Sequence, residues 1–571
     1  MEYLCRTRPC IVAAGKRFLS DPSNPDTLKM HAKTVILTQW KLINHLKSFF
    51  AKFNTDGTFE KALNKEFIEF LQKVDPKTYG KDTMRYFSSA LSFESNKEKS
   101  VTETNGEQEK SSVITFPTTF PNVFGSIFKD EPKPKPVPKW KAAKPVISKE
   151  SVTSRTSQVL CALALAQSET SKLARVEDLI RHLKQYPEAK HAAFKEGAVR
   201  LLLRIKKKHK SEDVQSALNE AFALLGYALP VKGKGIRILS IDGGGIRGVL
   251  VIEMLRKLEE LSGKPVYEMF DFICGVSTGA IVGSLIGLKQ HTLDEAAEVY
   301  KRISSQIFNQ STFKGTSSLV WSHSYYDTDL WEKLLREQWD KSLIDTNRNL
   351  KCPKYCAVSA LVNHSRISAY LFRNYALPCR VQSQYLGSYD HQVWEAVRAS
   401  SAAPTYFEEF KTGNMIHQDG GILVNNPTAI AIHEAKLLWP TTPIQCVVSF
   451  GTGRTVPNPI ENAMSNVSNN TSWKHKFLAI LDSATDTEGV HAMLSDLLPE
   501  GTYYRFNPYL TEMLSMSEID PAKLEQLKRD AIMYLRRNED KFHHAAQHLS
   551  EEKGFVQKCE DWMNLQRQIY T

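Results

Sequence analysis

Apolar and polar positions along the centre of this chain predict two strands, each followed by a helix. Residues 236–241 alternate and are rich in β-branched side chains, which predicts a strand, and residues 249–261 show the periodicity of an amphipathic helix. Residues 272–274 form a short apolar run that predicts a second, buried strand, and residues 280–288 predict a buried helix. The two turns between strand and helix contain the residues of chemical interest.

The second turn places a serine between two glycines, in the order Gly275-Val276-Ser277-Thr278-Gly279. The backbone of such a turn is strained, and larger side chains at either glycine would collide with the flanking strand and helix. The serine hydroxyl then lies at a helix N-terminus, where free N–H groups favour developing negative charge. The pattern predicts a nucleophile, although a purely structural turn also fits so short a motif.

Residues 273–288 are also apolar enough for a hydropathy scan to interpret them as a membrane span. The stretch is short for a span, and it contains four glycines together with Ser277, Thr278 and Ser284. We therefore favour a buried helix.

The first turn is rich in glycine. Gly243, Gly244 and Gly245 expose consecutive backbone N–H groups, which can bind either a phosphate or an oxyanion. The spacing of Gly243, Gly245 and Gly248 also matches the dinucleotide-binding fingerprint. That fingerprint requires an acidic residue near the end of the second strand, where this chain has its serine turn. Arg247 adds a positive charge suited to a phosphate headgroup or to orienting the loop, and a plain surface arginine is the alternative.

A third motif, Asp419-Gly420-Gly421, lies far downstream at a predicted junction between a strand and a loop. Its glycines allow another backbone to approach, as a carboxylate facing a serine would require, although an aspartate in an ordinary turn shows the same tripeptide. A serine nucleophile usually takes its base from histidine, and His417 would share a strand face with Asp419. The residues alone leave Asp419 and His417 as alternative bases.

The three motifs, in this order, resemble those of the patatin-like phospholipases over about residues 236–453. Residues 400–407, 425–427 and 449–453 also agree with that family. The resemblance implies an α/β fold, a three-layer α/β/α patatin-like hydrolase domain, and a Ser–Asp dyad in which Ser277 is the nucleophile and Asp419 the base. It further implies an oxyanion hole at the first turn, formed by Gly243, Gly244, Gly245, Arg247 and Gly248. Gly275 and Gly279 would form the elbow around the nucleophile, and Gly420 and Gly421 would belong to the Asp-Gly motif.

The same resemblance implies calcium-independent hydrolysis of fatty-acyl esters of glycerophospholipids through an acyl-enzyme, with no metal and no cofactor. Free fatty acid and a lysophospholipid would be released. A triacylglycerol lipase or general esterase on the same fold, or a non-catalytic helical-repeat scaffold, are the alternatives.

The resemblance also implies an intracellular, membrane-associated protein of mitochondrial, endoplasmic reticulum or peroxisomal membranes. The last residues, Gln568-Ile569-Tyr570-Thr571, differ from the Ser-Lys-Leu address found in part of the family. Either delivery to the peroxisome is in doubt or the given sequence is shortened at this end.

Changes in composition divide the rest of the chain. The first residues are basic and faintly resemble a mitochondrial presequence, a Pro- and Lys-rich stretch follows, and apolar periodicity then predicts armadillo-like helix pairs that offer a surface to a protein partner. The helices expected at the C-terminal end would pack on the main sheet or form a lid. The predicted boundaries are 1–91 for a partly helical or targeting region, 92–150 for a disordered linker, 151–232 for the armadillo-like region, 236–453 for the patatin-like domain and 454–571 for a helical extension.

The 571-residue chain has a formal charge of +11 and a pI near 9.0. This charge favours an acidic partner, and for a lipid hydrolase an anionic membrane surface is a simpler partner than nucleic acid. No aromatic, basic RNA-binding motif occurs. Residues 206–210 form a basic cluster that is either a solvated face or a contact with anionic lipid. Nine cysteines, an odd number without a secretory signal, predict a reduced compartment in which Cys352 and Cys356 serve as packing residues.

Overall fold

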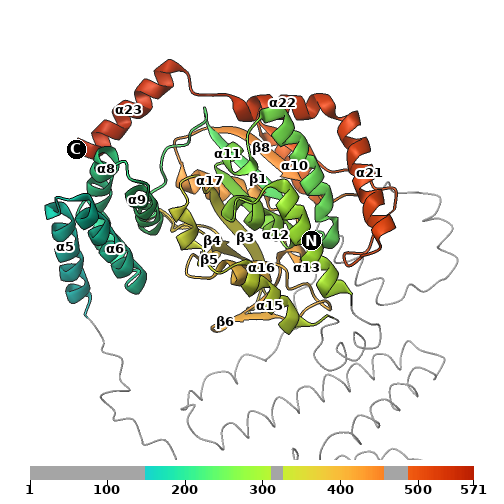
Figure 1. Cartoon of the computed structure of the whole chain (residues 1–571), viewed down its shortest axis with the longest axis horizontal. Coiled ribbons are helices and arrows are strands. Elements are labelled where there is room, and N and C mark those ends of the chain that lie inside the picture. The colour runs from blue at the N-terminus through green and yellow to red at the C-terminus, as the bar shows by residue number, and fades with distance from the viewer. Residues whose placement is uncertain (1–147, 310–325, 455–486, 513, 571) are drawn as a thin grey trace, which may run out of the picture. The chain divides into compact units, whose positions relative to one another are not determined.

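The computed structural model describes residues 148–309, 326–454, 487–512 and 514–570 (Figure 1). The predicted N-terminal region, the predicted linker up to residue 147 and residues 455–486 of the expected helical extension lie outside the described residues.

A nine-stranded mixed sheet forms the centre of the described chain (Figure 1). Its main path runs β5-β4-β3-β2-β1-β8-β9, and β7 pairs with both β3 and β6. Neighbours from β3 to β9 along this path are parallel, whereas β4 and β7 are antiparallel to β3. The bounds are β1 Ile236–Ile241, β2 Phe272–Val276, β3 Lys354–Leu361, β4 Ser368–Arg373, β5 Leu386–Ser388, β6 Phe410–Thr412, β7 Met415–Asp419, β8 Ile444–Phe450 and β9 Tyr503–Phe506.

Both faces of this sheet are covered by helices, as the pattern of β1 illustrates. All six residues of β1 are buried. Ile236 and Ile238 pack in the core that contains α17, whereas Leu239 and Ile241 pack in the core that contains α10. Central parallel strands buried on both faces show such near-continuous apolar runs. The predicted strands at 236–241 and 272–274 and the predicted helix at 249–261 are confirmed.

The helices that cover the sheet fall into two sets, one packed in the core that contains Ile236 and one packed in the core that contains Leu239. α17 (Thr428–Leu438) packs in the Ile236 core. The helices of the Leu239 core are α10 (Gly248–Ser262), α11 (Val266–Met269), α12 (Thr278–Gly283), α13 (Leu293–Phe308), α15 (Thr328–Gln338), α16 (Val393–Ser400), α21 (Pro521–Arg537) and α22 (Glu539–Ser550). Shorter turns are η1 (Gly245–Arg247), η2 (Ser284–Leu288), η3 (Ile344–Arg348) and η4 (Gly420–Ile422), and α20 spans Thr487–Leu497.

The apolar stretch 273–288 is divided between several elements and does not form one long helix. It begins in β2, passes through the turn at Ser277, and continues as α12 and the π-helical turn η2. Every residue of η2 is buried in the protein. No helix in the described parts of the chain combines the length and the apolarity needed to cross a bilayer.

Five helices precede the sheet and form a unit with its own core. They are α5 (Lys149–Leu165), α6 (Glu169–Gln185), α7 (Ala189–Lys195), α8 (Ala198–Lys208) and α9 (Glu212–Leu225). The buried carboxylate of Glu220 on α9 accepts from Lys184 at 2.6 Å and also pairs with Arg348 of η3. The C-terminal helix α23 (Phe555–Tyr570) returns to this unit, where Ile569 joins its core. The helical unit is therefore held against the sheet by both charge and apolar packing.

The segment after residue 453 contains a strand as well as helices, which differs from the expected helical extension. β9 pairs with β8 from Val447 and Tyr503 to Phe450 and Phe506, and so completes the sheet. β9 has only four residues, and a strand this short gives a weak local pattern. The expected boundary at residue 453 therefore cuts through the sheet.

A buried ion pair between Arg373 of β4 and Glu434 of α17 joins the sheet to the Ile236-side helix. Arg373 Nε lies 2.7 Å from Glu434 Oε2 and its Nη2 lies 2.9 Å from Oε1, and the two side chains are 4% and 0% exposed. Because Arg373→Ala leaves the Glu434 charge buried and without its partner, we expect it to lower the free energy of unfolding by about 3–5 kcal/mol.

The matched control is Arg175→Ala, which breaks the exposed pair between Arg175 and Asp178 on α6. We expect a loss below about 1 kcal/mol, since water screens that pair. Urea unfolding followed by circular dichroism measures both variants. Equal losses would show that the Arg373–Glu434 pair contributes no more than a surface pair.

Candidate active site

The candidate site lies where β2 and β7 meet end to end along one side of β3. β2 runs parallel to β3, and its last residue, Val276, pairs with Val358. β7 runs antiparallel to β3, and its last residue, Asp419, pairs with Ser359. Because Val358 and Ser359 are consecutive, the residue that follows β2 and the last residue of β7 are brought to one point of the sheet.

Ser277 occupies the tight turn between β2 and α12 with a positive φ of 52°. The flanking glycines are required by the close packing of this turn. A Cβ on Gly275 would lie 2.3 Å from the backbone of Gly279, and a Cβ on Gly279 would lie 2.2 Å from the carbonyl oxygen of Ile241. The strain fixes the Ser277 side chain at the carboxyl end of β2 and the N-terminus of α12.

The Ser277 hydroxyl donates a hydrogen bond of 2.6 Å to Oδ2 of Asp419. The other carboxylate oxygen accepts from the Gly421 N–H at 2.7 Å. Asp419 is only 5% exposed, and burial raises the pKa of its carboxyl to about 6, while the bonds from Ser277 and Gly421 oppose that rise. Asp419 is thus a stronger base than an exposed aspartate and is still ionised at neutral pH.

His417, the alternative base, is engaged elsewhere. Its Nδ1 is hydrogen-bonded to Ser359 Oγ at 2.9 Å and its Nε2 to Thr412 Oγ1 at 2.6 Å. The ring packs against Tyr370 and Phe372, and burial lowers the pKa of His417 to about 4. Both ring nitrogens therefore have partners other than Ser277.

The glycine-rich loop after β1 presents two free backbone donors. In the described part of the chain, the N–H groups of Gly244 and Gly245 donate to no protein acceptor, whereas the Gly243 N–H donates to Asn425 O at 3.3 Å. A Cβ on Gly244 would lie 2.1 Å from Thr452 Oγ1, so glycine is required there. Such consecutive free amides can hold an anionic oxygen.

Arg247 and Gly248 shape this loop. The Nε of Arg247 donates to the Gly244 carbonyl oxygen at 3.1 Å, which favours the loop-orienting role over contact with a headgroup. Gly248 begins α10, and its N–H bonds back to the carbonyl oxygen of Gly245. Of the five residues expected at the anion-binding turn, Gly244 and Gly245 present the free amides, and the others set the conformation.

A buried ion pair between Asp242 and Arg505 holds the start of the glycine-rich loop. Arg505 of β9 contacts both oxygens of Asp242, with Nη1–Oδ1 at 3.0 Å and Nη2–Oδ2 at 2.6 Å. Burial raises the pKa of Asp242 to about 6 against the opposing charge of Arg505. The pair ties the start of the glycine loop to the C-terminal strand. The spacing of residues along the chain does not reveal Arg505, which lies 263 positions from Asp242.

Ser400, at the end of α16, supports the nucleophile. Its hydroxyl donates to Val358 O at 2.6 Å and accepts from the Ser277 N–H at 2.9 Å. Ser400 thus links the β3 residue opposite the end of β2 to the nucleophile itself. The sequence shows it only as part of the segment 400–407 that agrees with the family, with no role attached.

An apolar pocket opens beside the Ser277–Asp419 pair. Gly245, Ser277 and Asp419 lie at its polar end. The apolar wall consists mainly of Ile281, Ile303, Ile307, Phe308, Trp331 and Phe407. A hydrocarbon chain attached to a carbonyl group fits this arrangement, with the carbonyl between the serine and the glycine amides. No group of three or more His, Cys, Asp or Glu side chains in the described residues is arranged to hold a metal ion.

Comparisons with known proteins agree with this chemistry. Residues 239–432 match the family model of the patatin-like phospholipases. The chain is 47% identical over 427 residues to the calcium-independent phospholipase A2-gamma of Oryctolagus cuniculus and 46% identical over 427 residues to that of Homo sapiens, over 74% of this chain and 54% of each relative. It is 32% identical over 403 residues to phospholipase A I of Arabidopsis thaliana, over 59% of this chain and 30% of that protein. The chain spans about half the length of the first two relatives.

The raised pKa of Asp419 predicts that this carboxylate lowers stability. The pKa rises from 3.8 to about 6 on folding, so the cost is present above pH 6 and disappears as the pH falls below 4. A shift of about two units corresponds to about 3 kcal/mol at most. We expect Asp419→Asn to raise the free energy of unfolding at pH 8 by up to that amount, and the gain to vanish near pH 4.

The control is Asp345→Asn, because the Asp345 pKa is lowered by its hydrogen bond to Lys184. That variant should lose stability at pH 8. Urea unfolding at pH 4, 6 and 8 measures both, and an Asp419→Asn protein no more stable than the parent at pH 8 would contradict the expectation.

Proposed function

We propose that this chain, in which residues 239–432 match the family model of the patatin-like phospholipases, is a calcium-independent phospholipase of that family acting on fatty-acyl esters of glycerophospholipids. The observation that carries the proposal is the 2.6 Å hydrogen bond between Ser277 and Asp419 at the mouth of an apolar cavity. The relatives' names support the substrate class.

In the first half of the reaction, Asp419 accepts the hydroxyl proton as Ser277 Oγ attacks the ester carbonyl. The N–H groups of Gly244 and Gly245 hold the resulting oxyanion. Collapse of the tetrahedral intermediate breaks the ester bond, and protonated Asp419 returns its proton to the departing lysophospholipid oxygen. The acyl chain remains on Ser277.

In the second half, water attacks the acyl-enzyme and gives its proton to Asp419. The same amides hold the second oxyanion, and its collapse transfers the proton to Ser277 Oγ and releases the fatty acid. A single carboxylate serves both halves because its pKa, near 6, allows it to accept and to return a proton close to neutral pH.

We assign the helices α5–α9 as an armadillo-like unit. They share one core, in which α5 packs on α6, α8 packs on α9, and α6 and α9 pack on each other. Stacked helix pairs of this kind present an extended surface suited to a protein partner.

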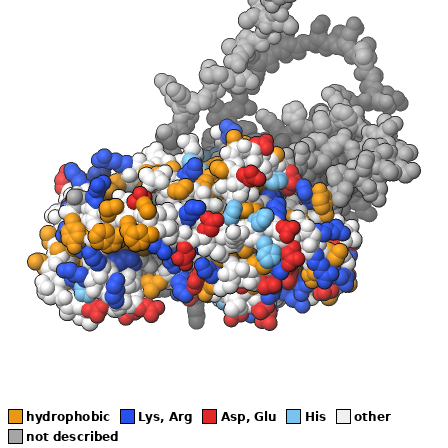
Figure 2. Space-filling view, turned by 90° about the horizontal axis from the view of Figure 1, so that it is seen from above, with side chains coloured by type: hydrophobic (Ala, Val, Ile, Leu, Met, Phe, Trp, Pro, Cys, Tyr) orange, Lys and Arg blue, Asp and Glu red, His pale blue; other side chains and the backbone are white. Residues whose placement is uncertain are grey.

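The membrane is the second partner in this proposal. α23 exposes one apolar face, with Phe555 83%, Trp562 62%, Met563 55% and Tyr570 66% exposed. The spacing of these residues places them on one side of the helix. Lys207 of α8 lies 5.5 Å from the centroid of the Tyr570 ring. Figure 2 shows hydrophobic side chains gathered beside Lys and Arg on this side of the molecule. An apolar stripe bordered by basic residues suits an anionic organelle membrane.

The catalytic assignment is tested with Ser277→Ala and Asp419→Asn. Both should abolish release of fatty acid from a defined mixed-chain phospholipid, by about four orders of magnitude, because base and nucleophile act as one unit. Mass spectrometry of the products with a calcium chelator present measures this. The parent should remain active under those conditions and lose kcat/KM as the pH falls below about 6, since protonated Asp419 cannot accept the Ser277 proton.

Two controls separate the base from its neighbours. Asp294→Asn, at a carboxylate that is 81% exposed, should leave activity unchanged. His417→Gln should retain activity and react with a fluorophosphonate at Ser277, because both ring nitrogens of His417 bond elsewhere. Activity that survives loss of Asp419 but not of His417 would make histidine the base, and faster cleavage of triacylglycerol than of phospholipid would change the substrate class.

Membrane contact through α23 is tested by sedimentation with vesicles of phosphatidylcholine with and without phosphatidylglycerol. We expect Trp562→Ser to weaken binding about tenfold, because a buried aromatic ring is worth about 1.5–3 kcal/mol. Leu386→Ser, at a leucine that is 53% exposed on β5, is the control and should change nothing. Equal binding of the parent and Trp562→Ser would remove α23 from the membrane contact.

A further inference from the structure

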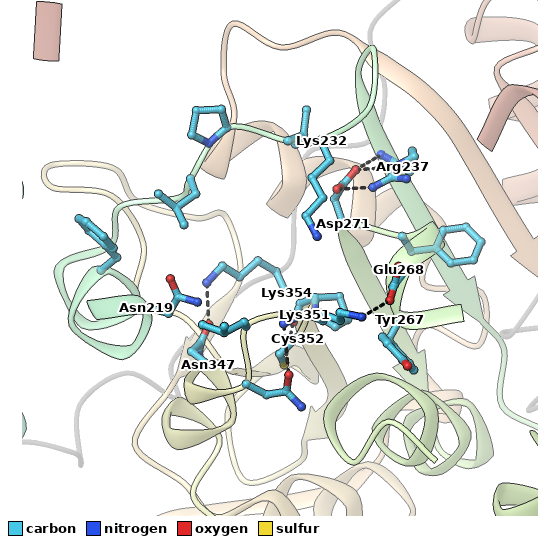
Figure 3. A pocket seen from close by; sticks show the side chains of 18 of the residues that line it. Asn219, Lys232, Arg237, Tyr267, Glu268, Asp271, Asn347, Lys351, Cys352 and Lys354 are labelled. Atoms are coloured by element: carbon cyan, nitrogen blue, oxygen red, sulfur yellow. Dashed lines mark hydrogen bonds and ion pairs between the residues drawn. The ribbon is translucent and has the colours of Figure 1, made fainter. Parts of the chain in front are cut away.

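A second pocket lies at the end of the sheet opposite Ser277, where the central strands begin. Figure 3 shows the side chains that line it. One wall consists of the first residues of the central strands, with Arg237 in β1, Asp271 just before β2 and Lys354 at the start of β3. Asn219 of α9 belongs to the facing wall. The cavity therefore opens where the helical unit meets the sheet, and it takes no part in the chemistry at Ser277.

The lining carries more positive than negative charge. Its four cations are Lys232, Arg237, Lys351 and Lys354, and its two carboxylates are Glu268 and Asp271. Two of these cations are neutralised by the two carboxylates.

Arg237 and Lys351 have carboxylate partners. Arg237 Nε lies 3.0 Å from Asp271 Oδ2 and its Nη2 lies 2.8 Å from Oδ1. Lys351 Nζ lies 2.6 Å from Glu268 Oε1. Among the described residues, no carboxylate pairs with Lys232 or Lys354, so the lining has an excess of two positive charges.

The side chain of Lys354 is held in place by a hydrogen bond to Asn347. Its Nζ donates to Asn347 Oδ1 at 2.7 Å, and that amide is oriented because its Nδ2 donates to the carbonyl oxygens of Ile344 and Asn374. Burial lowers the pKa of Lys354 to about 8, so its charge is costly without a counter-ion. Lys232, from the segment before β1, and Lys354, from β3, line the same pocket, and Figure 3 shows the Lys354 ammonium turned toward Asn347. Lys232 is exposed and free to close on an anion.

We propose that this cavity binds the phosphate group of a small molecule, a free phosphate ester or a lipid headgroup, between Lys232 and Lys354. A phosphate monoester carries a charge of about −1.5 to −2 at neutral pH, which matches the excess of two positive charges. Each ammonium has donors left for its oxygens, and Asn219 adds a side-chain amide on the facing wall. A ligand there would bridge α9 and β3.

The experiment is isothermal titration calorimetry at constant ionic strength and pH 7.5, with inorganic phosphate, glycerol 3-phosphate and phosphatidylcholine vesicles with or without phosphatidate as separate probes. The variants are Lys232→Gln and Lys354→Met, and the control is Lys333→Met at a lysine that is 72% exposed on α15, outside the cavity. We expect the parent and the control to bind at least one phosphate probe alike. Each cavity variant should bind it at least about tenfold more weakly, since a charged hydrogen bond is lost.

The source of the phosphate is identified by the probe whose binding the two lysine substitutions weaken. Binding of glycerol 3-phosphate or inorganic phosphate that both variants weaken identifies a soluble ligand, and a response confined to phosphatidate vesicles identifies a headgroup. Lys232 is exposed, so its variant tests the site without disturbing the fold, and Lys354→Met should be at least as stable as the parent by urea unfolding. Failure of all probes to bind the parent, or equal binding by both cavity variants and the control, would overturn the proposal whatever the outcome at Ser277.

Discussion

The pairing register of β3 is the constraint on which the candidate site depends. One side of this strand holds the end of β2 at Val358 and the end of β7 at Ser359, so two strands from distant parts of the chain stop at adjacent positions. A slip of one residue would turn every side chain of β7 to the other face of the sheet. Ser400 reinforces the junction by bonding both Val358 and the nucleophile. The contact between serine and carboxylate is therefore a property of the sheet as a whole.

Two buried aspartates near this junction have different roles because their surroundings differ. Burial raises the pKa of both to about 6. Asp242 is compensated by two contacts from Arg505, and its charge serves to hold the glycine loop to β9. Among the described residues, Asp419 has a hydroxyl and one backbone N–H as its hydrogen-bond partners, so it keeps a proton affinity suited to exchange with Ser277. The guanidinium group of Arg505 therefore gives Asp242 a structural role, whereas Asp419, bonded to Ser277, is suited to proton transfer.

Buried ion pairs also join the unit of helices α5–α9 to the rest of the described chain. Glu220 on α9 is fully buried and draws Lys184 and Arg348 to it, which links the helical unit to η3 beside β3. Close to this contact, Lys354 pairs with no carboxylate of the described residues, and it donates to Asn347 while lining a pocket. A buried charge without such a partner is costly, and the anion proposed for this pocket would offset that cost at Lys354.

The sequence by itself determined the local elements and the identity of the reactive groups. The strand at 236–241 and the helix at 249–261 follow from periodicity, because an isolated segment already shows which of its faces must be buried. The need for glycine around Ser277 follows from backbone sterics, and the family motifs favoured Asp419 over His417, which the residues alone left open. Only the tertiary structure decided the partners: Arg505 for Asp242, Ser400 for Ser277, Thr412 and Ser359 for His417, β9 for β8, and the pair of lysines at the far end of the sheet. Those contacts join positions far apart along the chain or lie at the ends of short strands, where hydrophobic periodicity carries no information and proximity arises only from sheet register and packing.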